Sequence, residues 1–154
     1  MKTKKPKKEK TLLGWREWVQ LPNLTKFPIK AKIDTGARTS ALHAHNIEIH
    51  KRLNHSWVTF ELVPSIKMSK PIHVKAQLIE HRNVKSSSGH MEPRPVIKTT
   101  VKMGSEEFEI ELTLVNRSLM GYRMLIGRRA LKRRFYINPS RSFLLDKKRD
   151  RRVT

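Results

Sequence analysis

The tripeptide Asp34-Thr35-Gly36 is the strongest candidate for chemistry in this chain. It follows residues 29–33, which alternate apolar and basic side chains, so the carboxyl group should lie at the end of a strand. Gly36 permits a sharp turn there, and the Thr35 hydroxyl can hydrogen-bond to neighbouring backbone. A carboxylate held in this way can activate water for hydrolysis. The same residue types also end many ordinary strands, so the tripeptide alone leaves both interpretations open.

Two histidines, His43 and His45, are the best hint of a metal site, because alternate positions share one face of a strand. They would make only half a zinc site. The sequence contains no cysteine, no His-Glu-x-x-His and no glycine-rich phosphate-binding loop. We therefore predict no metal ion, no ATP and no other cofactor.

Short β-strands should position the candidate aspartate. Strands rich in β-branched and aromatic residues, or alternating in polarity, are predicted over residues 29–33, 57–63, 72–79, 96–103, 108–115, 135–137 and 143–145. One short helix is predicted over residues 128–134, opened by Gly127. The sequence thus predicts a mostly β fold, a closed β-barrel with one short C-terminal helix.

Residues 81–95 differ from the strands around them, because they are small and polar and then punctuated by prolines. A long loop inside a compact barrel is usually either a functional lid or a disordered insertion. Since a strand resumes directly at Val96, we favour the lid.

The length of 154 residues suits a single domain, and the charge of +21 is distributed over all of it. We expect basic tails at 1–11 and 147–154 and one domain over 12–146; residues 11–146 alone retain +12. Such an excess favours an anionic partner, either nucleic acid or a polyacidic peptide. No apolar run approaches the length of a membrane span, and the basic start is not followed by an export signal, so we expect a cytoplasmic protein.

A second motif, Met124-Leu125-Ile126-Gly127-Arg128, follows the first by about ninety residues. The order of Asp-Thr-Gly-Ala, a glycine-bearing loop and then apolar-apolar-Gly-Arg resembles the retropepsins. Longer strings, 14–19, 32–44, 111–117 and 120–128, are similar to a bacterial and archaeal family (RimB-like) often labelled "ATP-dependent zinc protease". Its members are often encoded near a glutamate ligase that modifies a ribosomal protein.

The resemblance implies a retropepsin-like fold and an aspartic peptidase that removes poly-α-glutamate tails from a protein, for which a ribosomal protein is the expected substrate. Asp34, Thr35 and Gly36 would be catalytic, with Leu125, Ile126 and Gly127 supporting them. Aspartic peptidases need two carboxyl groups that share one proton. Because this chain carries one Asp-Thr-Gly, it should act as a homodimer.

Arg38 departs from many viral retropepsins, in which the fourth residue after the catalytic aspartate is another aspartate that pairs with the arginine of the second motif. Here both positions are cationic, Arg38 and Arg128. We expect a substrate-binding group that faces acidic side chains, made of Arg38, Arg128, Arg94, His90 and Arg123. Alternatively, some of these arginines are solvated or pair with Glu109 or Glu111.

Two other functions stay open. A basic β-barrel could bind RNA through its cleft, with Trp15, Trp18 and Trp57 as stacking surfaces, and the tails could contact ribosomal RNA. A retropepsin-shaped protein could also bind acidic peptides without cutting them.

Overall fold

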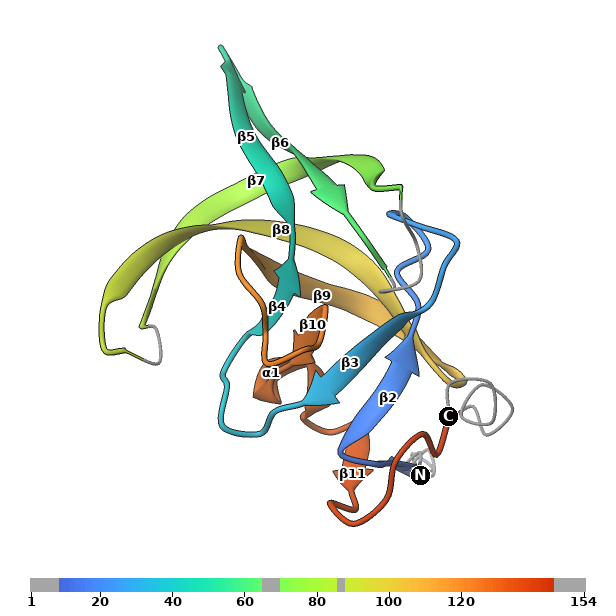
Figure 1. Ribbon diagram of the computed structural model, residues 1–154. Helices are drawn as coiled ribbons and strands as arrows, with labels where there is room; N and C mark the ends of the chain where they lie inside the picture. The colour runs from blue at the N-terminus through green and yellow to red at the C-terminus, as the bar shows by residue number, and fades with distance from the viewer. Residues whose placement is uncertain (1–8, 65–69, 86–87, 146–154) are drawn as a thin grey trace, which may run out of the picture.

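The computed structural model describes residues 9–64, 70–85 and 88–145, in which nearly all the regular elements are β-strands (Figure 1). Within them, nine strands form one sheet in the order β2-β3-β10-β4-β9-β8-β7-β6-β5, and β1 pairs with β11 in a second, two-stranded sheet. The strands are β1 (Thr11–Leu13), β2 (Arg16–Val19), β3 (Ile29–Ile33), β4 (Ser40–His43), β5 (His45–Arg52), β6 (His55–Leu62), β7 (Ile72–Lys85), β8 (Met91–Met103), β9 (Glu106–Val115), β10 (Met124–Ile126) and β11 (Phe135–Ile137).

The mostly β prediction is confirmed, but the predicted closed barrel is wrong. The large sheet is open in the described chain, with β2 and β5 as its edges. The sheet curls far enough for Gln20, just after β2, to exchange two backbone hydrogen bonds with Lys102 of β8. A single bridge of this kind joins the two parts at one point only, so the strands do not pair around a full circle.

The core lies on the face of the sheet where alternate strand residues are apolar. In β3, Ile29, Ala31 and Ile33 are buried, whereas Lys30 and Lys32 are only half-buried. The largest fully buried side chains come from all parts of the sheet and include Phe60, Leu62, Ile97, Leu112, Leu114, Met124 and Ile126. The strand predicted over 29–33 is confirmed to the residue because this alternation is unbroken.

The predicted loop over 81–95 is wrong, because most of it is strand. β7 and β8 continue as a two-stranded ribbon whose register runs from His81↔Pro95 to Lys85↔Met91, and in Figure 1 this ribbon curves well away from the other strands. Pro93 and Pro95 are tolerated there because β8 begins to pair with β9 only at Val96. A proline without an N–H fits a strand that has a partner on one side only.

The C-terminal predictions need two further corrections. The helix is shorter than expected: α1 spans Arg128–Leu131, the chain leaves the helical conformation at Lys132 with a ψ of 133°, and Arg133 then has a positive φ of 68°. Residues 143–145 form no strand. Instead, the Leu144 and Leu145 N–H groups donate to the carboxylate of Glu17, at 3.0 and 3.1 Å.

Candidate active site

The Asp34-Thr35-Gly36 turn lies where two parallel strands end side by side. β3 and β10 pair in parallel, with Ile33 opposite Ile126. The pairing extends one residue further, since the Asp34 N–H donates to the Ile126 carbonyl at 2.9 Å. The two sequence motifs, about ninety residues apart, are therefore neighbours in the fold, as their order predicts.

Hydrogen bonds within the turn fix the aspartate. The Gly36 N–H donates to Asp34 Oδ1 at 3.0 Å, and the Ala37 N–H donates to the Asp34 carbonyl at 3.2 Å. Gly36 does not have a positive φ; its small size matters because a Cβ there would lie 3.2 Å from Asp34 Oδ1. The Arg128 guanidinium donates to the Thr35 carbonyl at 2.9 Å and so supports the turn from the second motif.

Gly127 is packed against the chain that leaves the turn. Its N–H donates to Ser40 Oγ at 3.0 Å, and the next N–H, of Arg128, donates to the Ala37 carbonyl at 2.8 Å. A Cβ on Gly127 would lie 2.6 Å from the Thr39 carbonyl carbon, so only glycine fits. The two loops thus interlock, while the role of Leu125, Ile126 and Gly127 in supporting catalysis stays a prediction.

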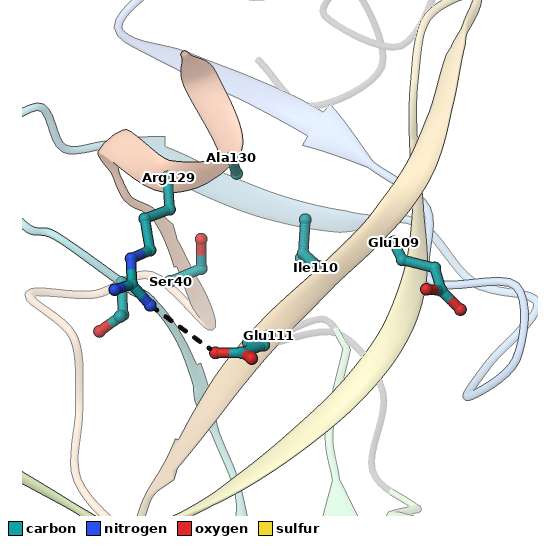
Figure 2. Close-up of a pocket in the computed structure, with 7 residues that line it drawn as sticks. Ser40, Glu109, Ile110, Glu111, Arg129 and Ala130 are labelled. Atoms are coloured by element: carbon teal, nitrogen blue, oxygen red, sulfur yellow. Dashed lines mark ion pairs between the residues drawn. The ribbon is translucent and has the colours of Figure 1, made fainter. Parts of the chain in front are cut away.

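The turn is open to solvent in the single chain. Asp34 is half-buried, and Thr35 and Gly36 are exposed. A neighbouring pocket of about 240 Å³ lies between α1 and β9 and is lined by Ser40, Glu111, Arg129 and Ala130 among others, but not by Asp34 (Figure 2). Within it Arg129 approaches Glu111, with 3.9 Å between Nη1 and Oε2. This pocket adjoins the chain that leaves the turn but does not enclose the Asp34 carboxylate.

The structure brings only some of the predicted substrate-binding residues to the turn. Arg38 is exposed directly after it, and its carbonyl accepts from the Arg129 N–H at 3.1 Å. His90 is exposed and lies directly before the first residue of β8. Arg94 lies elsewhere on β8, with its side chain 11% exposed and 3.7 Å from Glu92, which also approaches Arg117. Burial and Arg117 lower the pKa of Arg94 despite the glutamate.

Arg123 precedes β10, at the opposite end of that strand from the Asp34 turn. Its guanidinium donates to Nδ1 of His43 at 3.2 Å, and the His43 ring lies 4.6 Å from that of His45. Burial, His45 and Arg123 hold the pKa of His43 below its ordinary value. The histidine pair does come together, but no group of three metal-ligating side chains was found among the described residues.

Two supporting residues were missed by the sequence reasoning. Ser40 receives the Gly127 N–H, and the buried Glu17 accepts from three backbone N–H groups, the third being that of Gly14 at 2.6 Å. The position of Glu17 between Trp15 and Trp18 could have indicated that its side chain is buried. Ser40 had none, because serine is ordinary in a loop after a turn.

An Asp-Thr-Gly turn interlocked with an apolar-apolar-Gly loop at the ends of two parallel strands defines a retropepsin-like protein. The family model described as "Retropepsin-like aspartic endopeptidase RimB" matches residues 12–148. The chain belongs to this RimB-like family.

Curated relatives carry a different name. The chain is 44% identical over 146 residues to a "Probable alpha-L-glutamate ligase" of Shewanella pealeana, covering 94% of this chain and 32% of the relative. A protein of the same name from Desulfotalea psychrophila is 42% identical over 133 residues, covering 85% and 28%. The chain spans about a third of the length of these relatives.

A solved structure shares the fold. A Legionella pneumophila protein of unknown function has a TM-score of 0.75 to this chain at 23% identity, covering 90% of this chain and all of that one. Among the described residues, no helix is long and apolar enough to cross a membrane.

Proposed function

We propose that the protein is an aspartic peptidase that acts as a homodimer and hydrolyses acidic, glutamate-rich tails on another protein. The observation that carries this proposal is the Asp34 carboxylate, held by the Gly36 N–H in an interlocked and solvent-open turn. A carboxylate fixed at a strand end is suited to activate water, provided that a second carboxyl group polarises the scissile carbonyl.

The second carboxyl group has to come from another copy of the chain. Asp34 is the only aspartate of the described residues, since Asp146 and Asp150 lie outside them. A two-fold axis beside the exposed turn would bring two Asp34 side chains together, and like charge would make the pair share one proton. The exposed Thr35, whose hydroxyl makes no hydrogen bond within the described residues, is free to contact the partner.

Two observations support an acidic substrate. Arg38 leaves the turn with an exposed side chain and, among the described residues, no carboxylate partner, so a cation stands beside the catalytic position. The relatives named as glutamate ligases contain a segment similar to this chain. A peptidase and a ligase that share a polypeptide or a substrate would act on the same glutamate tail.

The rival function, RNA binding by the tryptophans, is weakened by their contacts. Trp18 stacks on Phe143 at 6.0 Å, and Trp15 packs edge-on against Tyr122 at 6.2 Å. Trp57 already stacks on two imidazoles, at 5.2 and 5.1 Å. Each ring is thus engaged within the chain rather than open to a base. The basic tails that could contact ribosomal RNA lie largely outside the described residues.

The test is to incubate the purified protein with a glutamate-tailed peptide, with and without a chelator, and to follow glutamate release by mass spectrometry. The parent should cleave in both conditions, and Asp34→Asn should not cleave. Cleavage that survives Asp34→Asn would refute the dyad mechanism, and loss of cleavage with the chelator would support a metal.

Mixing the two proteins tests the dimer separately. If each active site needs one Asp34 from each copy, an equal amount of Asp34→Asn added to a fixed amount of parent should reduce the activity to about half, because random pairing sequesters half of the parent chains. Undiminished activity with mixed dimers formed, as seen by mass photometry or native mass spectrometry, would contradict a shared site.

A further inference from the structure

Two lysines share the face of the sheet on which Asp34 lies. Alternate residues of a strand point to the same side, so Lys30, Lys32 and Asp34 form one series. Burial agrees with this, because Lys30, Lys32 and Asp34 are half-buried while Ile29, Ala31 and Ile33 point into the core. With about 6.6 Å between same-side residues, Lys32 lies one repeat from Asp34 and Lys30 lies two.

The neighbouring strand adds a third cation to the same face. Leu125 of β10 lies opposite Lys32, and the register places Arg123 opposite Lys30. Both Leu125 and Arg123 are half-buried, whereas Met124 and Ile126 are buried in the core. Lys30, Lys32 and Arg123 thus surround the apolar side chain of Leu125, and Lys32 is the one of the three nearest to the candidate aspartate.

None of these three cations has a carboxylate partner among the described residues. The Lys32 ammonium lies 3.7 Å from the Met120 sulfur, that of Lys30 lies 5.6 Å from the centre of the Tyr122 ring, and Arg123 donates to neutral His43 Nδ1. Elsewhere in the described chain, cations do find glutamates, namely Arg82, Arg94, Lys98, Arg117 and Arg129. Lys30, Lys32 and Arg123 can therefore bind an anionic group of another molecule.

We propose that Lys30, Lys32 and Arg123 form the subsite that binds an acidic side chain of the substrate beside the scissile bond, with Lys32 the main determinant of specificity. His43 positions Arg123 by accepting its hydrogen bond. Leu125 between the cations suits the methylene groups of a glutamate, whose carboxylate then reaches the ammonium and guanidinium groups. The subsite rests on the proposed peptidase function and specifies which residues select its substrate.

A peptide fits this surface better than a nucleic acid strand. The Tyr122 ring is contacted by Trp15 and lies beneath the Lys30 ammonium, and Trp18, opposite Lys30 on β2, stacks on Phe143, so neither ring is free for a base. Binding of single strands normally combines cations with such open rings. Lys32 also lies one strand repeat from Asp34, and the Asp34 carboxylate would repel a phosphate backbone.

The experiment measures binding without turnover. In full-length Asp34→Asn protein, the affinities for a fluorescent hexaglutamate and a matched hexaglutamine peptide are determined by anisotropy. Added Lys32→Met, Lys30→Met or Arg123→Met should each weaken hexaglutamate binding about tenfold and leave hexaglutamine unchanged, as expected for loss of a charge-assisted hydrogen bond. Lys51→Met, the same charge change on the exposed side of β5, is the matched control and should change binding less than twofold.

Urea unfolding of each variant confirms that it folds. The same substitutions are then made in the protein that retains Asp34, and the ratio of kcat/KM for the glutamate peptide to kcat/KM for the glutamine peptide is compared. Equal losses in Lys32→Met and Lys51→Met, or an unchanged preference for glutamate in Lys32→Met, would overturn the subsite while leaving the peptidase intact. If the three substitutions weaken hexaglutamate binding but the parent protein cuts no peptide, the subsite would be supported and the peptidase function refuted. A single-stranded RNA that binds more tightly than hexaglutamate, and depends on Lys32, would replace the peptide as the occupant.

Discussion

Replacing Glu17 with glutamine should destabilise the fold strongly although it changes the shape of the side chain very little. The Glu17 side chain is fully buried, and its two oxygens accept the N–H groups of Gly14, Leu144 and Leu145 at 2.6, 3.0 and 3.1 Å. Oε2 receives two of them and Oε1 the third. These bonds tie the start of β2 to the last described residues of the chain.

The expected loss in the free energy of unfolding follows from the number of N–H groups that donate to Glu17. A glutamine can keep its oxygen at the Oε2 position, but its NH₂ group then faces the Leu145 N–H, so one charge-assisted hydrogen bond is lost and two donors oppose each other. Such a bond contributes about 1.5–3 kcal/mol, and a buried unsatisfied donor costs about 1–3 kcal/mol. Glu17 has no cationic partner among the described residues, and removing such a buried charge offsets part of this loss. We expect a net loss of about 2–4 kcal/mol in the free energy of unfolding.

Urea unfolding followed by tryptophan fluorescence measures the loss, and hydrogen exchange at Leu144 and Leu145 locates it. Glu107→Gln, on the exposed start of β9, is the matched control and should change the free energy by less than about 0.5 kcal/mol. If Glu17→Gln were as stable as this control, the three hydrogen bonds would not contribute as described.

Three further predictions concern the candidate site. Gly127→Ala puts a Cβ 2.6 Å from the Thr39 carbonyl carbon and should cost about 1–3 kcal/mol of unfolding free energy in urea, together with loss of any peptidase activity. Arg128→Met removes the exposed hydrogen bond to the Thr35 carbonyl, so it should cost only about 1 kcal/mol but speed amide exchange in the turn; unchanged exchange would contradict the supporting role. Because the pKa of His43 is lowered in the fold, the unfolded chain binds a proton that the folded protein does not as the pH falls below 6.5, so stability should decline there; His43→Gln should flatten this part of a pH series of urea curves.

The sequence predicted the elements whose pattern is local. β3 alternates without interruption and was predicted to the residue, and the two motifs were correctly expected to meet. The ribbon over 81–95 was misinterpreted because Pro93 and Pro95 signal a loop, and only the tertiary register shows that β8 has a single neighbour there. The sequence likewise did not predict that the sheet is open, because closure into a barrel would depend on pairing between the distant edge strands β2 and β5.

The meeting of the two motifs could be predicted from short strings, whereas the neighbours that depend on strand register could not. Asp34 and Gly127 each belong to such a short string. Lys30 and Lys32 were seen only as the polar half of a strand, although they have the same parity as Asp34. Arg123 was expected near the substrate, but its place beside Lys30 depends on the parallel pairing of β10 with β3, which no short string encodes.

The contacts between residues 11–17 and residues 135–145 have a consequence for folding. β1 pairs in parallel with β11, the Trp15 N–H donates to the Arg141 carbonyl, and the Glu17 carboxylate accepts from the N–H groups of Leu144 and Leu145. Until residues 135–145 have left the ribosome, β1 has no partner strand and the Glu17 carboxylate lacks two of its three N–H donors, although β2 can already pair with β3. Non-local contacts of this kind form slowly, on a timescale of about milliseconds to seconds, so β1 and the Glu17 hydrogen bonds should be completed late in folding, after the local strand pairs.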